Sequence, residues 1–336
     1  MSTRTVLLAV ALLAAVFFLM FRSASRPEVV VYTSLDPVFS RTILAEFEKE
    51  TGIRARAVFD TEATKTTGLI ERVRRERERP QCDVLWSNEP LRTIRLAKEG
   101  LFTPYRSPAA EGIPPRFRDA SGLWTGFAAR ARVIAFDPQK LSADRVPRTL
   151  EAIFDESFRD QIALADPRFG TTGSHLAAWL AAWGEERYRA FLERLRDHGV
   201  QIVGGNSMSR DRVLSGEVLL GFTDTDDVEV ARRAGDSIDE TFLADEGTLV
   251  LPNTVAIVAN SPNPEAAQAL VDFLLARARE EALAAAPSRQ IPVRDDVPVP
   301  LTGLRLSDVR EGDYDLEAAA AALPRALDIA GEIFRR

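Results

Sequence analysis

Five polar side chains follow directly on a short apolar run, residues 218–222, in the second half of the chain. They are Thr223, Asp224, Thr225, Asp226 and Asp227. The apolar run predicts a buried strand, and the ligands of open α/β sheets lie just beyond the carboxyl ends of the strands. Asp226 or Asp227 would also suit the start of a helix near Val228. A helix cap does not account for all five polar groups, so we interpret this run as one wall of a ligand cleft.

A second candidate site lies between a predicted strand at 162–166 and a predicted helix at 175–183. The residues in question are Thr171, Thr172, Gly173 and Ser174. Backbone N–H groups at a helix start are unpaired and point outward at the positive end of the helix dipole, where they hold a carboxylate or a phosphate. The same residues also suit an ordinary helix cap, so both interpretations stay open.

Polar residues end the other predicted strands as well. Ser34 ends a strand at 28–34, Asn88 and Glu89 follow a strand at 82–86, and Asn206 follows a strand at 200–203. Arg130 and Arg132 alternate with apolar residues in a long strand at 124–137. A guanidinium group suits the binding of an anion, but a salt bridge along an edge strand explains either arginine equally well.

Strands alternate with amphipathic helices along the chain, which predicts an α/β fold with mostly parallel sheets and right-handed connections. The further expected strands lie at 53–59 and 248–258. Helices are expected at 38–51, 69–79, 91–99, 187–198, 209–215, 264–283 and 316–334. The densest basic run, 72–79, is interleaved with glutamates and predicts a solvated helix face with ion pairs.

Composition excludes several classes of protein. The chain has 336 residues, a net charge of −7 and a single cysteine, Cys82. The length predicts two lobes of ordinary domain size, and the acidic balance argues against a nucleic-acid partner. One cysteine excludes a disulfide framework, and the two histidines, His175 and His198, are far apart in the sequence and do not favour a metal pair.

The N-terminus predicts export. Arg4 precedes an unbroken apolar run, 6–21, which is followed by small residues up to Ser25. This pattern predicts a signal peptide within residues 1–26. An uncleaved membrane anchor is the alternative, because the run is just short of a comfortable membrane span. In both cases the remainder of the chain is expected in the periplasm.

Seven short segments follow one another in a fixed order. They are Val-Val-Tyr-Thr-Ser, Phe-Glu-Lys-Glu-Thr-Gly-Ile, Asp-Val-Leu-Trp-Ser, Glu-Gly-Leu-Phe, Arg-Ala-Arg-Val-Ile-Ala-Phe, Asp-Pro-Arg-Phe-Gly-Thr-Thr and Pro-Asn-Thr-Val-Ala-Ile. No single segment is diagnostic, but together, over about residues 29–293, they resemble the periplasmic solute-binding proteins of bacterial ABC importers. The branch in question contains ferric-ion-binding, thiamine-binding and phosphonate-binding members.

This resemblance implies the two-lobed periplasmic-binding-protein fold (type II), in which each lobe is a mostly parallel sheet flanked by helices and hinge strands join the lobes. Lobe 1 would comprise residues 27–132 plus about 255–290, and lobe 2 would comprise 133–254 plus about 291–336. The lobes would close on a ligand, and residues 132–136 and 253–258 would lie near the crossings.

The resemblance also implies positions for a ferric site. Ferric binders of this branch use a His after the first strand, a Glu after the third strand and an adjacent tyrosine pair. Here the matching positions hold Asp36 or its neighbour Leu35, then Asn88 followed by Glu89, and finally Asp224 with Thr225. The tyrosine ligands are therefore missing. The helix start that holds a synergistic anion in those proteins matches Thr172, Gly173 and Ser174, with Asn206 and one of Arg130 or Arg132 nearby.

Two kinds of ligand follow. One is a hard cation, with ferric iron favoured by the resemblance, bound through oxygen by Asp36, Glu89, Asp224 and Asp226, with or without an anion. The other is an organic anion such as a phosphonate, a phosphosugar or a thiamine-like solute. The expected ligand-contacting residues are Ser34, Asn88, Arg130, Thr171, Thr172, Gly173, Ser174, Asn206, Thr223, Asp224 and Thr225.

The expected function is that of a monomeric, non-catalytic binding protein that delivers a small ligand to an ABC permease in the inner membrane. Beyond a transported ferric ion and its anion, no cofactor is expected. A hydrolase with paired carboxylates is a rival, but the sequence has no Gly-x-Ser-x-Gly or Gly-x-Gly-x-x-Gly motif and no plausible Cys–His pairing. A ligand sensor that keeps residues 6–21 as an anchor is the other rival.

Overall fold

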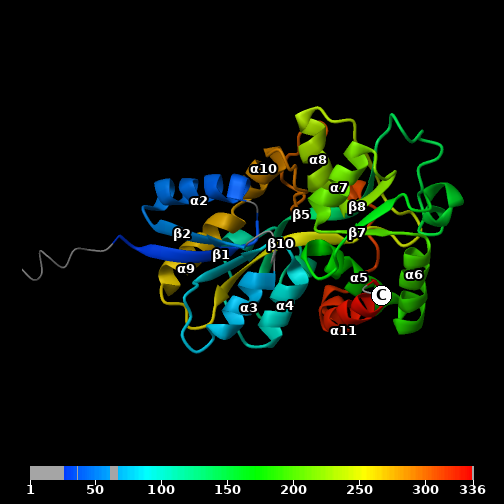
Figure 1. Ribbon diagram of the computed structural model, residues 1–336. Helices are drawn as coiled ribbons and strands as arrows, with labels where there is room; N and C mark the ends of the chain where they lie inside the picture. Colours follow the sequence, from blue (N-terminus) through cyan, green and yellow to red (C-terminus); the bar gives the residue numbers. More distant parts are fainter. Residues whose placement is uncertain (1–25, 36, 61–66, 335–336) are drawn as a thin grey trace, which may run out of the picture.

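Two sets of parallel strands are joined by two long strands that run from one set to the other (Figure 1). The computed structural model describes residues 26–35, 37–60 and 67–334. β1 (Glu28–Thr33) pairs in parallel with β2 (Arg54–Phe59) and β3 (Val84–Ser87), and we call this half lobe 1. β6 (Ile162–Ala165) pairs in parallel with β7 (Gln201–Val203) and β8 (Leu220–Asp224), and this half is lobe 2.

The two long strands are β5 (Thr125–Phe136) and β10 (Val250–Val258), and they pair antiparallel with each other. β10 also pairs with β3, and β5 also pairs with β8, so the strand order is β2-β1-β3-β10-β5-β8-β6-β7. The short strands β4 (Phe102–Thr103) and β9 (Asp239–Thr241) pair with β10 and β5. The predicted α/β fold with mostly parallel sheets and two long strands is confirmed.

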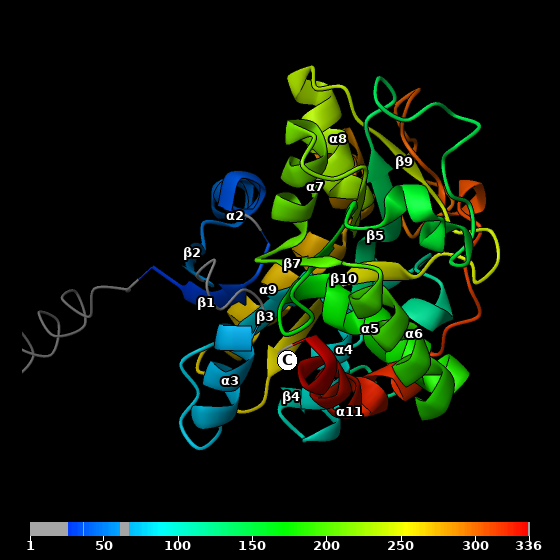
Figure 2. The same ribbon diagram turned by 45° about the vertical axis from the view of Figure 1, so that its right-hand side comes forward.

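Helices cover both faces of each half. In lobe 1 they are α2 (Pro37–Thr51), α3 (Thr67–Arg75), α4 (Pro90–Lys98), α9 (Pro264–Leu275) and α10 (Arg277–Ala285). In lobe 2 they are α5 (Gly170–Trp183), α6 (Glu185–Asp197), α7 (Asn206–Ser215), α8 (Thr225–Ala234) and α11 (Leu316–Phe334). Figure 2 shows α7 and α8 on one side of the lobe 2 strands and α5, α6 and α11 on the other.

The core follows from the twofold periodicity of buried strands. On β1, Val29 and Val31 belong to the apolar cluster under α2 and α9, whereas Val30 and Tyr32 belong to the cluster under α3 and α4. A strand buried on both faces is apolar throughout its length, and each such side chain contributes roughly 1.5–3 kcal/mol. This burial fixes the position in the sheet at which each strand ends. It therefore also fixes where the polar residues that follow the strand lie.

The crossing strands are kinked where they pass between the lobes. Their register shifts between Pro252 and Asn253, and Ala128 in β5 has a φ of 42°. The side-chain amide of Asn253 donates to the carbonyls of Phe127 (3.3 Å) and Ala128, which holds the kink from the neighbouring strand. The strands that carry Arg130 and Arg132 are therefore irregular at the point where the lobes meet.

Several predicted boundaries are wrong, among them the helices predicted at 69–79 and 209–215, and those of α5 and β8 matter for function. The helix predicted at 264–283 is two helices, because Ala276 has an extended backbone (φ −63°, ψ 138°) that ends α9. α5 begins at Gly170, so Thr171–Ser174 lie inside the helix and do not precede it. β8 extends through Asp224, so Asp226 and Asp227 lie in the first turn of α8.

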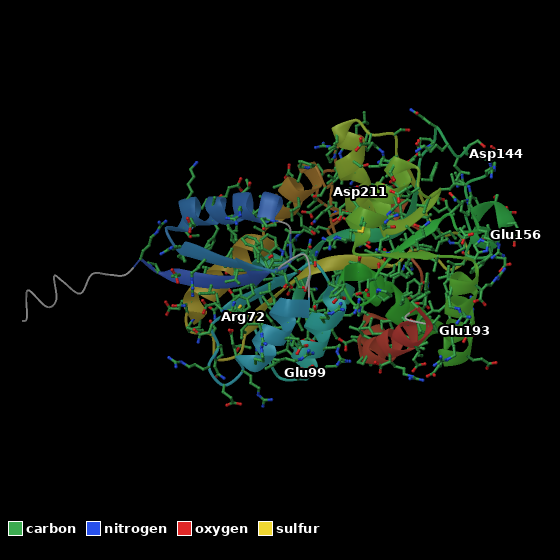
Figure 3. The ribbon with its side chains drawn as sticks, viewed as in Figure 1. Arg72, Glu99, Asp144, Glu156, Glu193 and Asp211 are labelled. Atoms are coloured by element: carbon green, nitrogen blue, oxygen red, sulfur yellow. The ribbon has the colours of Figure 1, made fainter. Side chains whose placement is uncertain are left out.

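The charged surface behaves as predicted. In α3 and the turn after it, Arg72 pairs with Glu76 (2.7 Å), and Arg74 pairs with Glu71 and with Glu99 of the next helix (2.7 Å). Figure 3 shows Arg72 and Glu99 on the outside of lobe 1. These ion pairs agree with the expected solvated helix face for Arg72 and Arg74, but α3 ends at Arg75, so residues 76–79 of the basic run lie in the turn after the helix.

The segment after α10 returns to lobe 1 before α11 joins lobe 2. Ile291 and Val293 are fully buried in the lobe 1 cluster, whereas Ala326 and Ile329 of α11 are buried with the residues of α5 and α6. The lobe boundaries given above stay a prediction. The predicted signal segment and Asp36 lie outside the described residues; within the described ranges, no helix is both long and apolar enough to cross a membrane.

Candidate functional site

The guanidinium group of Arg132 lies at the centre of a polar network in lobe 2. Arg132 on β5 is the cross-strand partner of Asp224 on β8, and its Nη1 lies 2.7 Å from Oδ1 of Asp224. The same nitrogen donates to Thr171 Oγ1 (3.0 Å) and to Asn206 Oδ1 (3.2 Å), while Nη2 donates to Thr172 Oγ1 (3.3 Å). Arg132 is only 3% exposed, so this is a buried, hydrogen-bonded ion pair.

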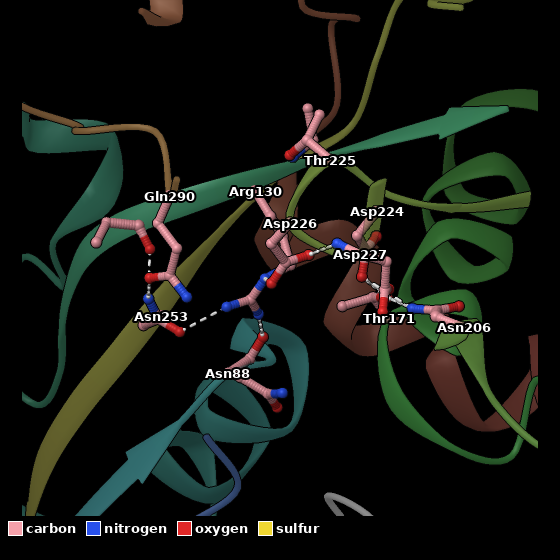
Figure 4. Close-up of polar contacts among 12 residues, drawn as sticks. Asn88, Arg130, Thr171, Asn206, Asp224, Thr225, Asp226, Asp227, Asn253 and Gln290 are labelled. Atoms are coloured by element: carbon pink, nitrogen blue, oxygen red, sulfur yellow. Dashed lines mark hydrogen bonds and ion pairs between the residues drawn. The ribbon is translucent and has the colours of Figure 1, made fainter. Parts of the chain in front are cut away.

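Asp224 connects the ends of three elements. Its Oδ2 accepts hydrogen bonds from Thr171 Oγ1 (2.6 Å) on α5 and from Asn206 Nδ2 (2.8 Å) on α7, as Figure 4 shows. Asp224 is the residue that precedes α8, yet its side chain makes no capping bond to that helix. The carboxylate is therefore directed into the network of Arg132 and away from its own helix.

His175 completes the surroundings of Arg132. Its Nδ1 accepts a hydrogen bond from Nε of Arg132 (3.4 Å), and its ring packs against that of Trp179 in a tilted arrangement, with 4.0 Å between the ring centroids. Burial, together with the charge of Arg132, holds the pKa of His175 well below its usual value. The imidazole is therefore neutral and acts as a hydrogen-bond acceptor within lobe 2.

Arg130 connects both lobes and the crossing strand. Its Nε lies 3.0 Å from Oδ2 of Asp226 on α8, its Nη2 lies 2.8 Å from Oδ1 of Asn253 on β10, and its Nη1 donates to the carbonyl of Asn88 in lobe 1 (Figure 4). Asn88 in turn accepts a hydrogen bond from Ser34 at 2.8 Å. Arg130 is 2% exposed, so its charge is neutralised by the protein and not by water.

Three carboxylates gather where β8 ends and α8 begins. Asp224, Asp226 and Asp227 each offer one oxygen, and these oxygens lie within 4.8 Å of one another. Burial, and then the negative charges of Asp226 and Asp224, raise the pKa of Asp227 to about 7. Carboxylates held this close favour either a proton or a cation between them, and a set of oxygen ligands suits a hard metal ion.

Glu89, one of the predicted metal ligands, lies outside this group of three. Its side chain is fully buried and caps α4: Oε1 accepts from the backbone N–H of Leu91 (2.7 Å), and Oε2 accepts from that of Arg92 (3.0 Å) and from the Arg92 guanidinium (3.2 Å). It also accepts a hydrogen bond from Ser174 of α5. In this structure Glu89 is held by the protein's own donors.

All four tyrosines of the sequence lie away from the three carboxylates, in agreement with the missing phenolate ligands. Tyr32 donates to Glu76 (2.9 Å), Tyr105 to Asp272 (2.9 Å) and Tyr188 to the carbonyl of Ala326 (3.0 Å). Tyr314 lines a separate cavity together with Trp124. Phenolate oxygen is thus not available to a ligand bound at Asp224.

The structure brings most of the predicted ligand-contacting residues into one connected network. The members of this network are Ser34, Asn88, Arg130, Arg132, Thr171, Thr172, Asn206, Thr223, Asp224, Asp226 and Asp227. Thr225 lies beside it and accepts from the backbone N–H of Ala131 (3.1 Å). Sequence reasoning left Arg130 and Arg132 as alternatives, and both belong to the network. It missed the grouping of Asp227 with the other two carboxylates, although Asp227 stood in the polar run after β8, and it missed the contact of Asn253, which was expected only near the crossings between the lobes.

The start of α5 is closely packed at Gly173. A Cβ atom there would lie 2.3 Å from the carbonyl oxygen of Pro167, which is backbone and cannot move aside cheaply. The residue before the helix, Phe169, provides no side-chain cap. The first turn of α5 is therefore held in place by packing against the preceding loop, and only glycine fits at this position.

We expect Gly173→Ala to destabilise the protein by roughly 1–3 kcal/mol, because the added methyl group forces α5 away from Pro167. Thermal melting checks this result. Gly205→Ala is the matched control, since nothing lies within 4 Å of its added Cβ and its φ of −177° is ordinary extended backbone. Equal melting temperatures for the two variants would contradict the close packing of α5.

Comparison with known proteins places the chain in context. Residues 89–302 match the family described as bacterial extracellular solute-binding protein. Iron uptake protein A1 of Synechocystis sp. is 26% identical over 317 residues, which cover 91% of this chain and 86% of that protein.

Two solved structures have the same fold. Iron-bound HitA from Pseudomonas aeruginosa has a TM-score of 0.82 at 21% identity, covering 92% of this chain and 99% of its own. AfuA from Actinobacillus pleuropneumoniae, with exogenous fructose-6-phosphate bound, has a TM-score of 0.81 at 19% identity, covering 93% and 99%. The predicted two-lobed periplasmic-binding-protein fold is confirmed by this likeness.

Proposed function

Because this chain belongs to the family of bacterial extracellular solute-binding proteins, we propose that it captures a hard metal cation of the ferric type between its lobes and delivers the cation to an ABC permease. The observation that carries the proposal is the group of three carboxylates, Asp224, Asp226 and Asp227, whose oxygens lie within 4.8 Å of one another. The likeness to iron uptake protein A1 and to iron-bound HitA supports iron as the cation.

The arginines set the charge balance of the proposed site. Arg132 already pairs with Asp224, and Arg130 already pairs with Asp226. A cation that binds Asp226 takes the place of Arg130 at that carboxylate, while Asp227, on the same turn of α8, contributes an oxygen of its own. At Asp226, binding thus exchanges the guanidinium group of Arg130 for the metal cation. This exchange is favourable only if the cation is multivalent.

A second candidate ligand is an organic anion that carries a phosphate or a phosphonate group. It is favoured by two buried guanidinium groups, those of Arg130 and Arg132, and by the position of Arg132 beside Thr172 at the start of α5. The start of α5 lacks a side-chain cap, as a site for an anion requires. The likeness to AfuA, which was solved with fructose-6-phosphate, supports this candidate.

The two candidate ligands can be distinguished by which of them raises the melting temperature of the protein. We expect ferric ion, supplied as a weak chelate, to raise the melting temperature, because a ligand at a hundred times its dissociation constant stabilises the native state by about 2.7 kcal/mol. The panel should include the iron-free chelator, other metal ions, phosphonates, phosphosugars and thiamine. A shift produced only by an organic anion would replace the cation proposal with the second candidate.

The proposed function also implies a location of the protein in the cell. We place the protein in the periplasm as a monomer, exported by the apolar segment at residues 6–21 and acting with a permease of the inner membrane. Mass spectrometry of the N-terminus of the protein isolated from the periplasm tests the cleavage near Ser25.

A further inference from the structure

Glu89 joins the starts of two helices that belong to different lobes. It precedes α4 in lobe 1, where both its carboxylate oxygens accept from the first-turn backbone N–H groups of Leu91 and Arg92. Its Oε1 also accepts a hydrogen bond from the hydroxyl of Ser174, which lies on α5 of lobe 2. One carboxylate therefore lies at the positive end of the α4 dipole and also binds a side-chain hydroxyl near the start of α5.

A second bond between the lobes runs beside this one. The guanidinium of Arg92 donates from Nη1 to Glu89 (3.2 Å) and from Nη2 to the carbonyl of Arg168, in the loop before α5 (3.1 Å). Glu89 is 0% exposed, Ser174 is 0% exposed and Arg92 is 5% exposed. The contact between the α4 start and the α5 start is thus a buried junction of the lobes.

No side-chain hydroxyl at the start of α5 is left for an outside anion. Thr171 donates to Asp224 (2.6 Å), Thr172 donates to Asn206 (3.1 Å) and Ser174 donates to Glu89. Two of these three acceptors are negatively charged, and both are carboxylates of the protein itself, Asp224 and Glu89. The chain therefore supplies, from Asp224 and Glu89, the negative charge that a helix start of this kind attracts.

We propose that Glu89 is a lobe-locking residue that takes the role of a co-bound anion: it holds α4 and α5 together in the ligand-free protein, so that the cation binds without an external anion. The inference that the cation binds without an external anion rests on the proposed function. The inference that Glu89 holds the lobes together does not. A locked closed state raises the apparent affinity, because affinity scales with the fraction of the protein that is already in the binding conformation.

The locking is tested without any ligand. Small-angle X-ray scattering of the ligand-free protein should give the radius of gyration of a closed molecule, and Ser174→Ala and Glu89→Gln should each increase it. The double variant should open no further than Ser174→Ala alone, because Glu89→Gln weakens the same contact that Ser174→Ala removes. The control is Ser209→Ala, a fully buried serine in lobe 2 whose hydroxyl donates within its own lobe to the carbonyl of Ala163 (3.2 Å).

Unchanged scattering of both Ser174→Ala and Glu89→Gln would overturn the inference. Ser174→Ala keeps the test decisive if Glu89→Gln fails to fold, since alanine suits a helix interior and leaves the cap of α4 intact.

The anion half is tested with terbium chloride, a hard trivalent probe excited through tryptophan. The affinity of the wild type for terbium should stay the same, within about twofold, when acetate is added. In Glu89→Gln it should fall by about tenfold, and acetate should restore part of it, because the added carboxylate replaces the missing one. A wild type that needs acetate to bind terbium would contradict the inference. If terbium does not bind at all, the cation proposal fails, while the scattering result still decides the locking.

Discussion

Asp224→Ala is expected to lower the affinity for the transported cation by at least tenfold and to destabilise the ligand-free protein. Asp224 is one of three carboxylates that offer oxygens within 4.8 Å of one another, so its loss removes a ligand and one negative charge. It is also the sole carboxylate in an ion pair with Arg132 within the described residues, at 2.7 Å. A buried charge left without its partner costs roughly 3–5 kcal/mol, which is a large share of the stability of a domain.

Titration calorimetry with the weak ferric chelate and thermal melting measure the two effects separately. Asp224→Asn keeps the shape and the hydrogen-bonding oxygen but loses the charge, so it should lose affinity while keeping more stability than Asp224→Ala. Asp328→Ala, at an exposed position of α11, is the control for loss of an acidic residue. An unchanged dissociation constant in Asp224→Ala would remove this carboxylate from the site.

Asp227→Asn is expected to stabilise the ligand-free protein at alkaline pH and to abolish part of its pH dependence. Burial and neighbouring carboxylates raise the pKa of Asp227 from 3.8 to about 7 in the folded protein. The folded state therefore holds a proton that the unfolded state releases between these values, and stability from this group is lost as pH rises from about 4 to about 7. A shift of about three units corresponds to at most about 4 kcal/mol.

Urea unfolding at several pH values provides the measurement. Above pH 8 the Asn variant should be more stable than the wild type, and well below pH 3.8 the two should converge, because Asp227 is then protonated in both the folded and the unfolded wild type. Above pH 7, where Asp227 of the wild type is ionised, cation binding should be weaker in the variant, since an amide is a poorer ligand than a carboxylate. Parallel stability curves for the two proteins would show that Asp227 has an ordinary pKa.

The position of the site could be predicted from the sequence because strand ends can be located from apolar runs. β1, β3, β7 and β8 end close to where the apolar residues stop, and Ser34, Asn88, Asn206 and Asp224 follow or end them. The twofold burial of the strands then brings these residues to the same edges of the two sheets, so their proximity is a consequence of topology. Which residues of the network pair with each other could not be predicted in the same way.

Side-chain direction could not be predicted because it depends on contacts between distant segments. Arg130 and Arg132 lie on the same face of β5 by periodicity, yet Arg130 reaches Asn88 of lobe 1 and Arg132 reaches Asp224 of lobe 2, partners that lie far from both in the sequence. Similarly, the start of α5 depends on Gly170 (φ 60°), which begins the helix well ahead of the expected position. In the helix that begins at Gly170, Ser174 lies opposite Glu89.

The place of β10 in the sheet also determines how the chain can fold. β10 (Val250–Val258) is the last strand in the sequence, but it lies between β3 (Val84–Ser87) and β5 (Thr125–Phe136) in the strand order. Contacts this distant in sequence are slow to form, because the loop must close before any pairing stabilises it. Neither lobe can complete its sheet until about three quarters of the chain is present, so we expect the chain to stay incompletely folded for most of its synthesis, a state that suits export before folding.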